Sequence, residues 1–306
     1  MRLIRVFALG LAALGATKGQ AHATDLVIEA VPVDIAPGTL KGLHLRGTHV
    51  LSADSPDFGG FSGLILRDGA LIAVSDSGWW LEAPLVDSPQ GLTPGPAQFQ
   101  PLTENGAPLD KSGGDAEALA EIEGQIWIAF ERDHRVMAHG GEGRLKNMVQ
   151  DRRFEALGSN KGLEALAPLP GGGLLAIAEA PNGGGHPAFL IHDGTITEAQ
   201  LPAHDPFYVT GADTGPDGRL YVLLRHFSPL TGVQIEIHRF ALGSSGLPDA
   251  SSREVLAHYP SRSGIDNMEG ISLWRDAEGR LRLTLISDDN FNLIQRTLLM
   301  DFEVIE

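Results

Sequence analysis

A fivefold repeat constrains this sequence more than any other feature. Each copy has a short segment of small and apolar residues with one polar or acidic residue, then a turn with Gly, Asp or Glu, then an apolar run that ends in a polar residue. The second copy illustrates the pattern, with Glu117 in the first segment, Glu123-Gly124 in the turn and Ile126–Phe130 before Glu131. The polar residues of the first segments, which we call tags, are Ser62, Glu117, Glu164, Asp213 and Glu269.

The spacing of the tags indicates the fold class. They lie 47 to 56 residues apart. A repeat of about 40–50 residues built from short strands and tight Gly turns is typical of a β-propeller, in which each repeat forms one blade around a central channel. Long amphipathic helical patterns and alternating strand–helix units are absent, which argues against a Rossmann fold or an α/β barrel. We therefore predict an all-β propeller of five blades, while the length of 306 residues also allows six.

The last repeat is too short to form a full blade, because the chain ends soon after a strand expected at residues 298–304. We predict that an N-terminal strand, either 26–33 or 44–51, completes this blade and closes the ring, since closure removes open sheet edges. Small residues near the tags suit the crowded inner strand of each blade. These residues are Gly63, Ala118, Ala165, Ala212 and Gly270.

The beginning of the chain is expected to lie outside the propeller. Arg2 and Arg5 precede an apolar run over residues 6–16, and Ala21-His22-Ala23 offers the small residues of a cleavage site. This pattern predicts a signal peptide over residues 1–23, cleaved before Thr24, and a single periplasmic or secreted domain over residues 24–306. The alternative, a membrane-anchoring helix, requires about 20 apolar residues. No later run reaches that length, so we expect no membrane insertion. We also expect a monomer.

Composition excludes several classes of function. The chain has no Cys, which rules out disulfides, thiolate zinc sites, iron–sulfur clusters and a Cys nucleophile. Its formal net charge of -16 argues against nucleic-acid binding, which needs a basic surface. The sequence has no Gly-x-Ser-x-Gly elbow, no Gly-rich phosphate loop followed by Lys and no His-Glu-x-x-His motif. Metal-assisted hydrolysis is therefore favoured over Ser catalysis.

The repeat brings acidic residues to equivalent positions. In a propeller the tags would surround one mouth of the channel, beside the residues that end each second strand, namely Asp76, Glu131, Glu179, Arg225 and Asp288. Like charges at close range repel in a low-dielectric site, and a cation relieves the repulsion. Ca²⁺ accepts about 6–8 oxygen ligands in irregular geometry. We therefore predict a Ca²⁺ site whose ligands are Asp76, Glu117, Glu164, Asp213, Glu269 and Asp288.

Three other interpretations of these acids stay open. Some carboxyls are protonated, or Arg side chains neutralise them, or each acid caps backbone N–H groups of the neighbouring strand.

Basic residues near the strand ends suit an anionic substrate, because a guanidinium matches phosphate or carboxylate oxygens in two-point contacts. We predict that a carboxylate acts as general base and that Arg side chains hold the reacting group. The predicted catalytic residues are Glu131, Glu179, Arg132 and Arg225. The predicted substrate-binding residues are Arg135, His134 and His226. The alternatives are that the Arg side chains neutralise the acids and that both His are solvated loop residues.

Several short motifs occur in an order that matches a known family. They are Phe58–Leu64 with Ser75–Gly78, Asp115–Ala118 with Phe130–Arg132, Gly162–Leu166, Asn267–Gly270, and Ser287–Phe291 followed by Gln295–Thr297. On these motifs the chain resembles the phytase-like family with esterase-like activity, a group of secreted propeller proteins, over roughly residues 40–304. The resemblance implies phosphate-ester hydrolysis with Ca²⁺ in an acidic channel. The Arg-His-Gly run of histidine-type phytases is absent, since Phe227 follows Arg225-His226.

The sequence thus predicts a secreted, Ca²⁺-dependent hydrolase of phosphate esters that acts on a small anionic substrate. One alternative is a non-catalytic propeller that binds a ligand or partner and holds a structural Ca²⁺. The other is a Ca²⁺-dependent lactonase or carboxylesterase.

Overall fold

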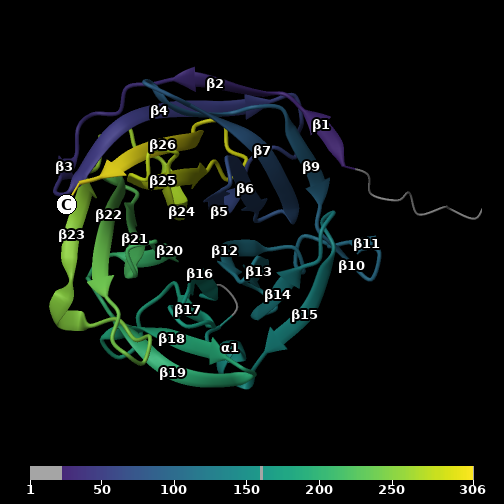
Figure 1. Cartoon of the computed structure of the whole chain (residues 1–306), viewed down its shortest axis with the longest axis vertical. Helices are drawn as coiled ribbons and strands as arrows, with labels where there is room; N and C mark the ends of the chain where they lie inside the picture. Colours follow the sequence, from purple (N-terminus) through teal and green to yellow (C-terminus); the bar gives the residue numbers. More distant parts are fainter. Residues whose placement is uncertain (1–22, 159–160, 306) are drawn as a thin grey trace, which may run out of the picture.

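The computed structural model describes residues 23–158 and 161–305. Five antiparallel sheets surround a central axis, and each sheet is one blade (Figure 1). The prediction of a five-bladed propeller is therefore confirmed. The predicted signal peptide lies outside the described residues except for its last residue, Ala23. None of the helices in the described part of the chain is long and apolar enough to cross a membrane.

Each blade begins with an inner strand at the channel and adds its other strands outward in the order that follows. Blade 1 contains β5 (Phe61–Arg67), β6 (Ala70–Ser75), β7 (Trp79–Ser88), β9 (Ala97–Pro101) and β1 (Thr24–Leu26), with β8 (Gly91–Pro94) paired to β7. Blade 2 contains β12 (Ala116–Ile122), β13 (Gln125–Phe130), β14 (Arg135–His139) and β15 (Leu145–Gln150). Blade 3 contains β16 (Leu163–Pro168), β17 (Leu174–Ala178), β18 (Gly185–His192) and β19 (Thr195–Pro202).

The remaining two blades include strands from the beginning of the chain. Blade 4 contains β20 (Tyr208–Thr214), β21 (Arg219–Ser228), β22 (Gly232–Ala241), β23 (Glu254–Tyr259) and β3 (Thr39–Leu40). Blade 5 contains β24 (Asn267–Arg275), β25 (Leu281–Asp288), β26 (Thr297–Val304), β4 (Leu43–Ala53) and β2 (Ile28–Pro32). Outside the blades lie the hairpin of β10 (Thr103–Glu104) and β11 (Ala107–Pro108), helix α1 (Arg152–Glu155) and the 3₁₀ turn η1 (Ala250–Ser252).

The N-terminal segment closes the ring, as predicted. Strand β4 pairs with β26, the last strand of the chain, in a register that sets Leu51 opposite Thr297. Strand β2 then pairs with the outer side of β4, so both candidate segments contribute to blade 5. The first strands also extend two neighbouring blades, because β1 pairs with β9 and β3 pairs with β23.

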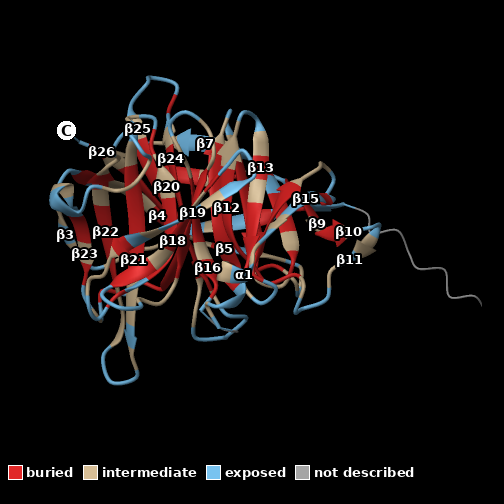
Figure 2. Cartoon of the chain, turned by 90° about the horizontal axis from the view of Figure 1, so that it is seen from below, coloured by how far each residue is buried: buried red, intermediate tan, exposed pale blue. Residues whose placement is uncertain are grey.

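The hydrophobic core is divided among the contacts between blades. Five clusters of buried apolar residues correspond to the five interfaces between successive blades. One of them joins blades 1 and 2 through Ile72, Leu119 and Ile128. Each sheet is therefore apolar on both faces, and buried residues run through the strands in the side view (Figure 2). This packing holds the ends of the inner strands in fixed positions around the channel.

Candidate functional site

A β-bulge occurs at the same place in every inner strand. The pairing of the first and second strands slips by one residue in all five blades. The unpaired residues at the bulges are Ser62, Glu117, Glu164, Thr210 and Glu269. A bulge re-aims the side chain that it carries and is common beside functional sites. Four of the five predicted tags are these bulge residues.

The fourth repeat is aligned differently from the prediction. The bulge of β20 lies at Thr210, three residues before the predicted tag, Asp213. The small residue after this bulge is Gly211, not Ala212, and a Cβ on Gly211 would lie 2.3 Å from the backbone oxygen of Glu269. The inner strands of blades 4 and 5 are therefore very close together at this point, which agrees with the crowding expected from the small residues near the tags.

Asp213 has a different environment from the tags. Its carboxylate accepts a hydrogen bond from the backbone N–H of Leu273, at 2.7 Å, in the inner strand of the next blade. Burial raises its pKa to about 7. In the next pair of inner strands, Ser272 accepts from the N–H of Leu66 at 2.9 Å in the same way. The structure thus separates Asp213 from the predicted ligands, and the interpretation that an acid caps the neighbouring strand describes it.

Equivalent positions on the second strands form a second ring. Four of its residues lie at the end of their strand, whereas Arg225, which was predicted to end its strand, lies three residues before the end of β21 because this strand continues to Ser228. Each of these residues lies opposite the residue two before the bulge. For example, the N–H of Asp76 donates to the oxygen of Gly60 at 2.8 Å, and that of Glu131 donates to Asp115 at 2.9 Å. The ring consists of Asp76, Glu131, Glu179, Arg225 and Asp288. The second ring therefore has the composition that the sequence predicted.

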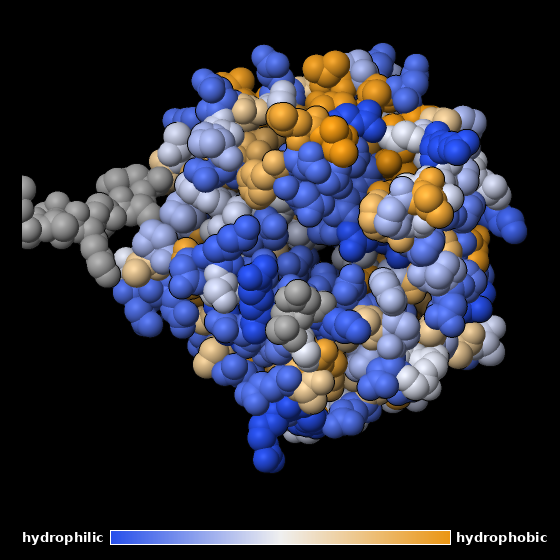
Figure 3. Space-filling model, turned by 180° about the vertical axis from the view of Figure 1, so that it is seen from behind, coloured by the Kyte–Doolittle hydropathy of each residue, from blue (hydrophilic) through white to orange (hydrophobic). Residues whose placement is uncertain are grey.

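The two rings and their polar neighbours form one acidic cluster, which we call the acidic mouth. Its carboxylates are Asp76, Asp115, Glu117, Glu131, Glu164, Glu179, Glu269, Asp288 and Asp289. Carboxylate oxygens of Asp115, Glu117 and Glu131 lie within 4.8 Å of one another. The molecule is hollowed at the centre of the ring, and largely hydrophilic residues surround the hollow (Figure 3).

Arg225 is the basic member of the second ring, and it lies against the acids. Its guanidinium donates to Glu269 at 2.9 Å and lies 3.5 Å from Glu179. It also bonds the side-chain oxygen of Asn267. This contact pattern fits the alternative in which an Arg side chain neutralises part of the acidic cluster. Arg225 can also contact a substrate, because 22% of its side chain is exposed.

Two polar residues that were not among the predicted site residues, Asn267 and the first tag, Ser62, connect the carboxylates. Asn267 donates to Glu269 at 2.8 Å and to Asp288 at 3.3 Å. Ser62 donates to the other oxygen of Glu269 at 3.1 Å, across the boundary between blades 5 and 1. Asn267 and Asp115 both stand two residues before a bulge, where two other blades have Gly60 and Gly162. A polar residue at this repeat position is a signal that the sequence alone contained.

Burial and mutual repulsion shift the pKa values of several carboxylates of the acidic mouth upward. Burial is the main cause for Glu117 and Glu164, whose pKa values lie well above the ordinary range, and the charges of neighbouring carboxylates add to it. The same two causes raise the pKa of Asp76 to about 6 and that of Asp288 to about 8. At neutral pH these residues must therefore share protons or a cation.

The donor set fits a hard cation. It consists of carboxylates, the Asn267 amide and hydroxyl groups from several strands, and Ca²⁺ prefers oxygen ligands of this kind. One oxygen of Asp76, Oδ1, is buried and has no hydrogen-bond partner among the described residues. A buried acceptor without a donor is costly unless a cation or proton binds it.

The predicted basic residues after Glu131 differ in their surroundings. Arg132 is about half exposed and bonds Asp115 through Nε. Arg135 is buried, donates to the oxygen of Gly113 at 2.7 Å and lies 4.2 Å above the Phe130 ring. The structure thus keeps Arg132 at the acidic mouth and fixes Arg135 inside blade 2.

The side chains of the two predicted histidines make no described contact with the acidic mouth, and only the backbone N–H of His134 reaches it, by donating to the backbone oxygen of Glu131 at 3.2 Å. His134 is buried, and its Nδ1 atom has no hydrogen-bond partner in the described part of the chain. His226 lies 3.1 Å from the oxygen of Pro206 through Nδ1, and its ring packs against Phe207. Neither position suggests the direct contact with substrate that the repeat predicted.

Comparison with known proteins defines the family. The sequence model described as "Phytase-like: Esterase-like activity of phytase" matches residues 56–291. The chain therefore belongs to the phytase-like family, as its motifs predicted. A search of curated proteins finds no match.

Solved structures with a similar backbone are distant in sequence. A glutaminyl cyclase from Myxococcus xanthus is 12% identical with a TM-score of 0.48, and the match covers 90% of this chain and 100% of that one. A catalytically inactive virginiamycin B lyase from Staphylococcus aureus, solved with quinupristin, is 11% identical with a TM-score of 0.45, and the match covers 92% of this chain and 100% of that one. A protein of unknown function from Dyadobacter fermentans is 13% identical with a TM-score of 0.46, and the match covers 94% of this chain and 96% of that one.

Proposed function

We propose that the chain is a Ca²⁺-dependent hydrolase that cleaves phosphate esters at the acidic mouth. The observation that carries the proposal is the convergence of buried carboxylates, with raised pKa values, from at least four blades on one end of the channel. The family description, which names an esterase-like activity of phytase, supports ester hydrolysis.

The cation would be held by five acids of the two rings, each buried or half-buried. These are Glu117, Glu164, Glu269, Asp76 and Asp288. When bound, Ca²⁺ would supply positive charge that offsets the carboxylates and polarises a phosphoryl oxygen. Asn267 and Ser62 orient Glu269 through the hydrogen bonds that they donate to its two oxygens.

The remaining polar residues suit the reaction itself. Glu131 and Glu179 belong to the second ring and are less buried than the bulge residues, and burial raises the pKa of both. A carboxylate with a raised pKa is a better general base than an ordinary one at neutral pH. Arg132 and Arg225 would hold the anionic oxygens of the substrate, since each guanidinium keeps donors that its acidic partner does not use.

The substitution Glu164→Gln tests this proposal. It removes one charge from the centre of the site with little change in shape, so we expect loss of stoichiometric Ca²⁺ binding in calorimetry and loss of turnover of an aryl phosphate. The matched control is Glu198→Gln on β19, where 67% of the side chain is exposed. Full Ca²⁺ binding and full turnover in Glu164→Gln would refute the proposal.

A carboxylic ester or a lactone is the second candidate substrate, because the family description names an esterase-like activity. A screen of phosphate esters, carboxylic esters and lactones, with Ca²⁺ and with chelator, separates the two. Turnover only of carboxylic esters or lactones would replace the phosphate-ester proposal. Tight Ca²⁺ binding with no turnover of any class would indicate a binding propeller with a structural ion.

A further inference from the structure

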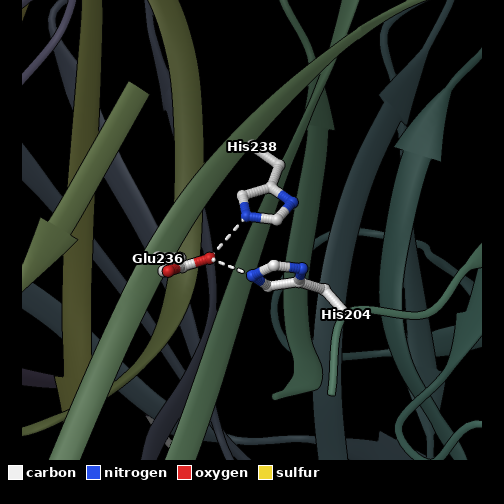
Figure 4. A group of neighbouring side chains, drawn as sticks. All are labelled: His204, Glu236 and His238. Atoms are coloured by element: carbon white, nitrogen blue, oxygen red, sulfur yellow. Dashed lines mark hydrogen bonds and ion pairs between the residues drawn. The ribbon is translucent and has the colours of Figure 1, made fainter. Parts of the chain in front are cut away.

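A second cluster of metal-ligating side chains lies outside the acidic mouth, on the outer part of blade 4. Glu236 and His238 are two residues apart on β22, so their side chains leave the same face of the sheet. His258 on β23 lies directly opposite Glu236 in the pairing register. His204 comes from the loop between β19 and β20 and points at the same carboxylate (Figure 4).

The ligand atoms converge on one carboxylate oxygen. Glu236 Oε2 lies 2.7 Å from His238 Nε2 and 3.1 Å from His204 Nε2 (Figure 4). The other oxygen, Oε1, lies 3.0 Å from His258 Nδ1. All three ligand atoms of His204, Glu236 and His238 lie within 4.8 Å of one another. The described residues contain one other such group, which consists of Asp115, Glu117 and Glu131 in the acidic mouth. That group has no imidazole.

The setting suits a metal. Glu236 is 8% exposed and His238 is 1% exposed, so both side chains are buried. The cluster therefore presents a carboxylate beside imidazole nitrogens in a largely buried setting, where a carboxylate is costly unless it is hydrogen-bonded or paired with a cation.

We propose that His204, Glu236 and His238 form a binding site for a divalent transition metal of the Zn²⁺ class. Tetrahedral Zn²⁺ bonds of about 2.0–2.2 Å place neighbouring ligand atoms about 3.3 Å apart. The observed separations of 2.7 and 3.1 Å would have to widen by about 0.6 and 0.2 Å to reach that value. Two imidazoles and one carboxylate are a common Zn²⁺ ligand set that leaves the fourth position open.

The surroundings supply the other parts of such a site. His258 fixes the carboxylate oxygen that does not face the metal, as outer partners of ligating carboxylates do. About a third of the His204 and His258 side chains is exposed, while His238 is buried, so an ion can enter from one side. The site differs in ligand chemistry from the oxygen-only acidic mouth, and the two proposals stand independently.

Calorimetry on the metal-stripped full chain in excess Ca²⁺, which occupies oxygen-ligand sites, tests the proposal. We expect one equivalent of Zn²⁺ per chain, and visible Co²⁺ absorption of the intensity typical of tetrahedral nitrogen–oxygen ligation. His238→Gln and His204→Gln should each weaken Zn²⁺ binding by at least about 100-fold, since loss of even an outer partner costs about 10–100-fold. His204 lies in a partly exposed loop, so its variant is the one least expected to disturb folding.

Two control variants define the outcome. His192→Gln removes an imidazole that is 53% exposed and lies 3.7 Å from Asp193, and Zn²⁺ binding should be unchanged. Glu164→Gln, in the acidic mouth, should also leave it unchanged. A wild-type chain without stoichiometric Zn²⁺ binding, or equal Zn²⁺ affinity in wild type and His204→Gln, would show that the cluster is only a hydrogen-bonded network.

Discussion

The substitution Glu117→Gln separates two properties of the acidic mouth: the folding stability lost to repulsion among its carboxylates, and its affinity for a cation. Glu117 is 8% exposed, and carboxylate oxygens of Asp115 and Glu131 lie within 4.8 Å of one of its own. At an effective dielectric constant of about 20, each such pair repels by about 3 kcal/mol. Without a cation, Glu117 therefore takes up a proton on folding, which agrees with its strongly raised pKa.

The size of the effect follows from proton linkage. A carboxyl with an ordinary pKa of 4.5 that must be protonated in the folded state loses up to about 3 kcal/mol of stability at pH 7, but less than about 1 kcal/mol at pH 5. The sign follows from the raised folded pKa, because the penalty grows as pH rises above the unfolded value. Gln removes the charge, so in chelator at pH 7 we expect Glu117→Gln to be more stable than wild type, by up to about 6 °C in Tm.

Calcium should remove or reverse this order. An ion at one hundred times its Kd stabilises the wild type by about 2.7 kcal/mol, whereas the variant lacks one ligand and should gain less. The assay is thermal unfolding at pH 5 and pH 7, in chelator and in Ca²⁺, with Glu198→Gln as the exposed control. A Glu117→Gln protein that is less stable than wild type in chelator at pH 7, or that gains as much from Ca²⁺, would refute the reasoning.

Three further predictions concern residues that are not themselves members of the acidic mouth. The pKa of Asp213 is raised to about 7 from 3.8, so its penalty grows as pH rises between these values. Asp213→Asn should stabilise the protein at pH 8 relative to pH 4 by roughly 4 kcal/mol in urea unfolding, and a pH-independent effect would contradict this. A Cβ at Gly211 would lie 2.3 Å from a backbone oxygen, so Gly211→Ala should lower the free energy of unfolding by about 1–3 kcal/mol in chemical unfolding. The control is Gly243→Ala, where the nearest atom would lie 3.5 Å from the Cβ, and equal stability of the two variants would count against the crowding argument. The fully buried Arg282 binds Asp301, and its guanidinium lies 3.2 Å from Asp276. Arg282→Leu should therefore lower the free energy of unfolding by about 3–5 kcal/mol and leave Ca²⁺ affinity unchanged in calorimetry. A change in Ca²⁺ affinity would contradict the placement of Arg282 outside the site.

The repeat made much of the site predictable. The second ring could be read from sequence because each of its residues directly follows an apolar run, and equivalent runs reach the same mouth of a propeller, although β21 continues past Arg225 to Ser228. The position of Thr210 could not be read in this way. The position of a bulge depends on how two strands pair. Asp213 was predicted to be the tag because it is acidic, although it lies three residues farther along the strand.

The histidines show the limit of sequence reasoning more clearly. Repeat equivalence selected His134 and His226, but neither imidazole contacts the acidic mouth among the described contacts. The histidines that do converge come from a loop and two strands of blade 4, at positions 204, 238 and 258. They occupy no common place in the repeat, so periodicity gave no reason to group them.

The sequence by itself predicted a propeller of five or six blades, the closure of the ring by an N-terminal strand and the acidic character of the channel mouth. These properties follow from the alternation of apolar strands and Gly turns at a fixed period, which is a local property of the chain. Only the tertiary structure decided which oxygens and nitrogens meet, as Asn267 does with Glu269 and His204 with Glu236. Such contacts depend on strand register and on packing between blades, where a shift of one residue turns a side chain to the opposite face of its sheet.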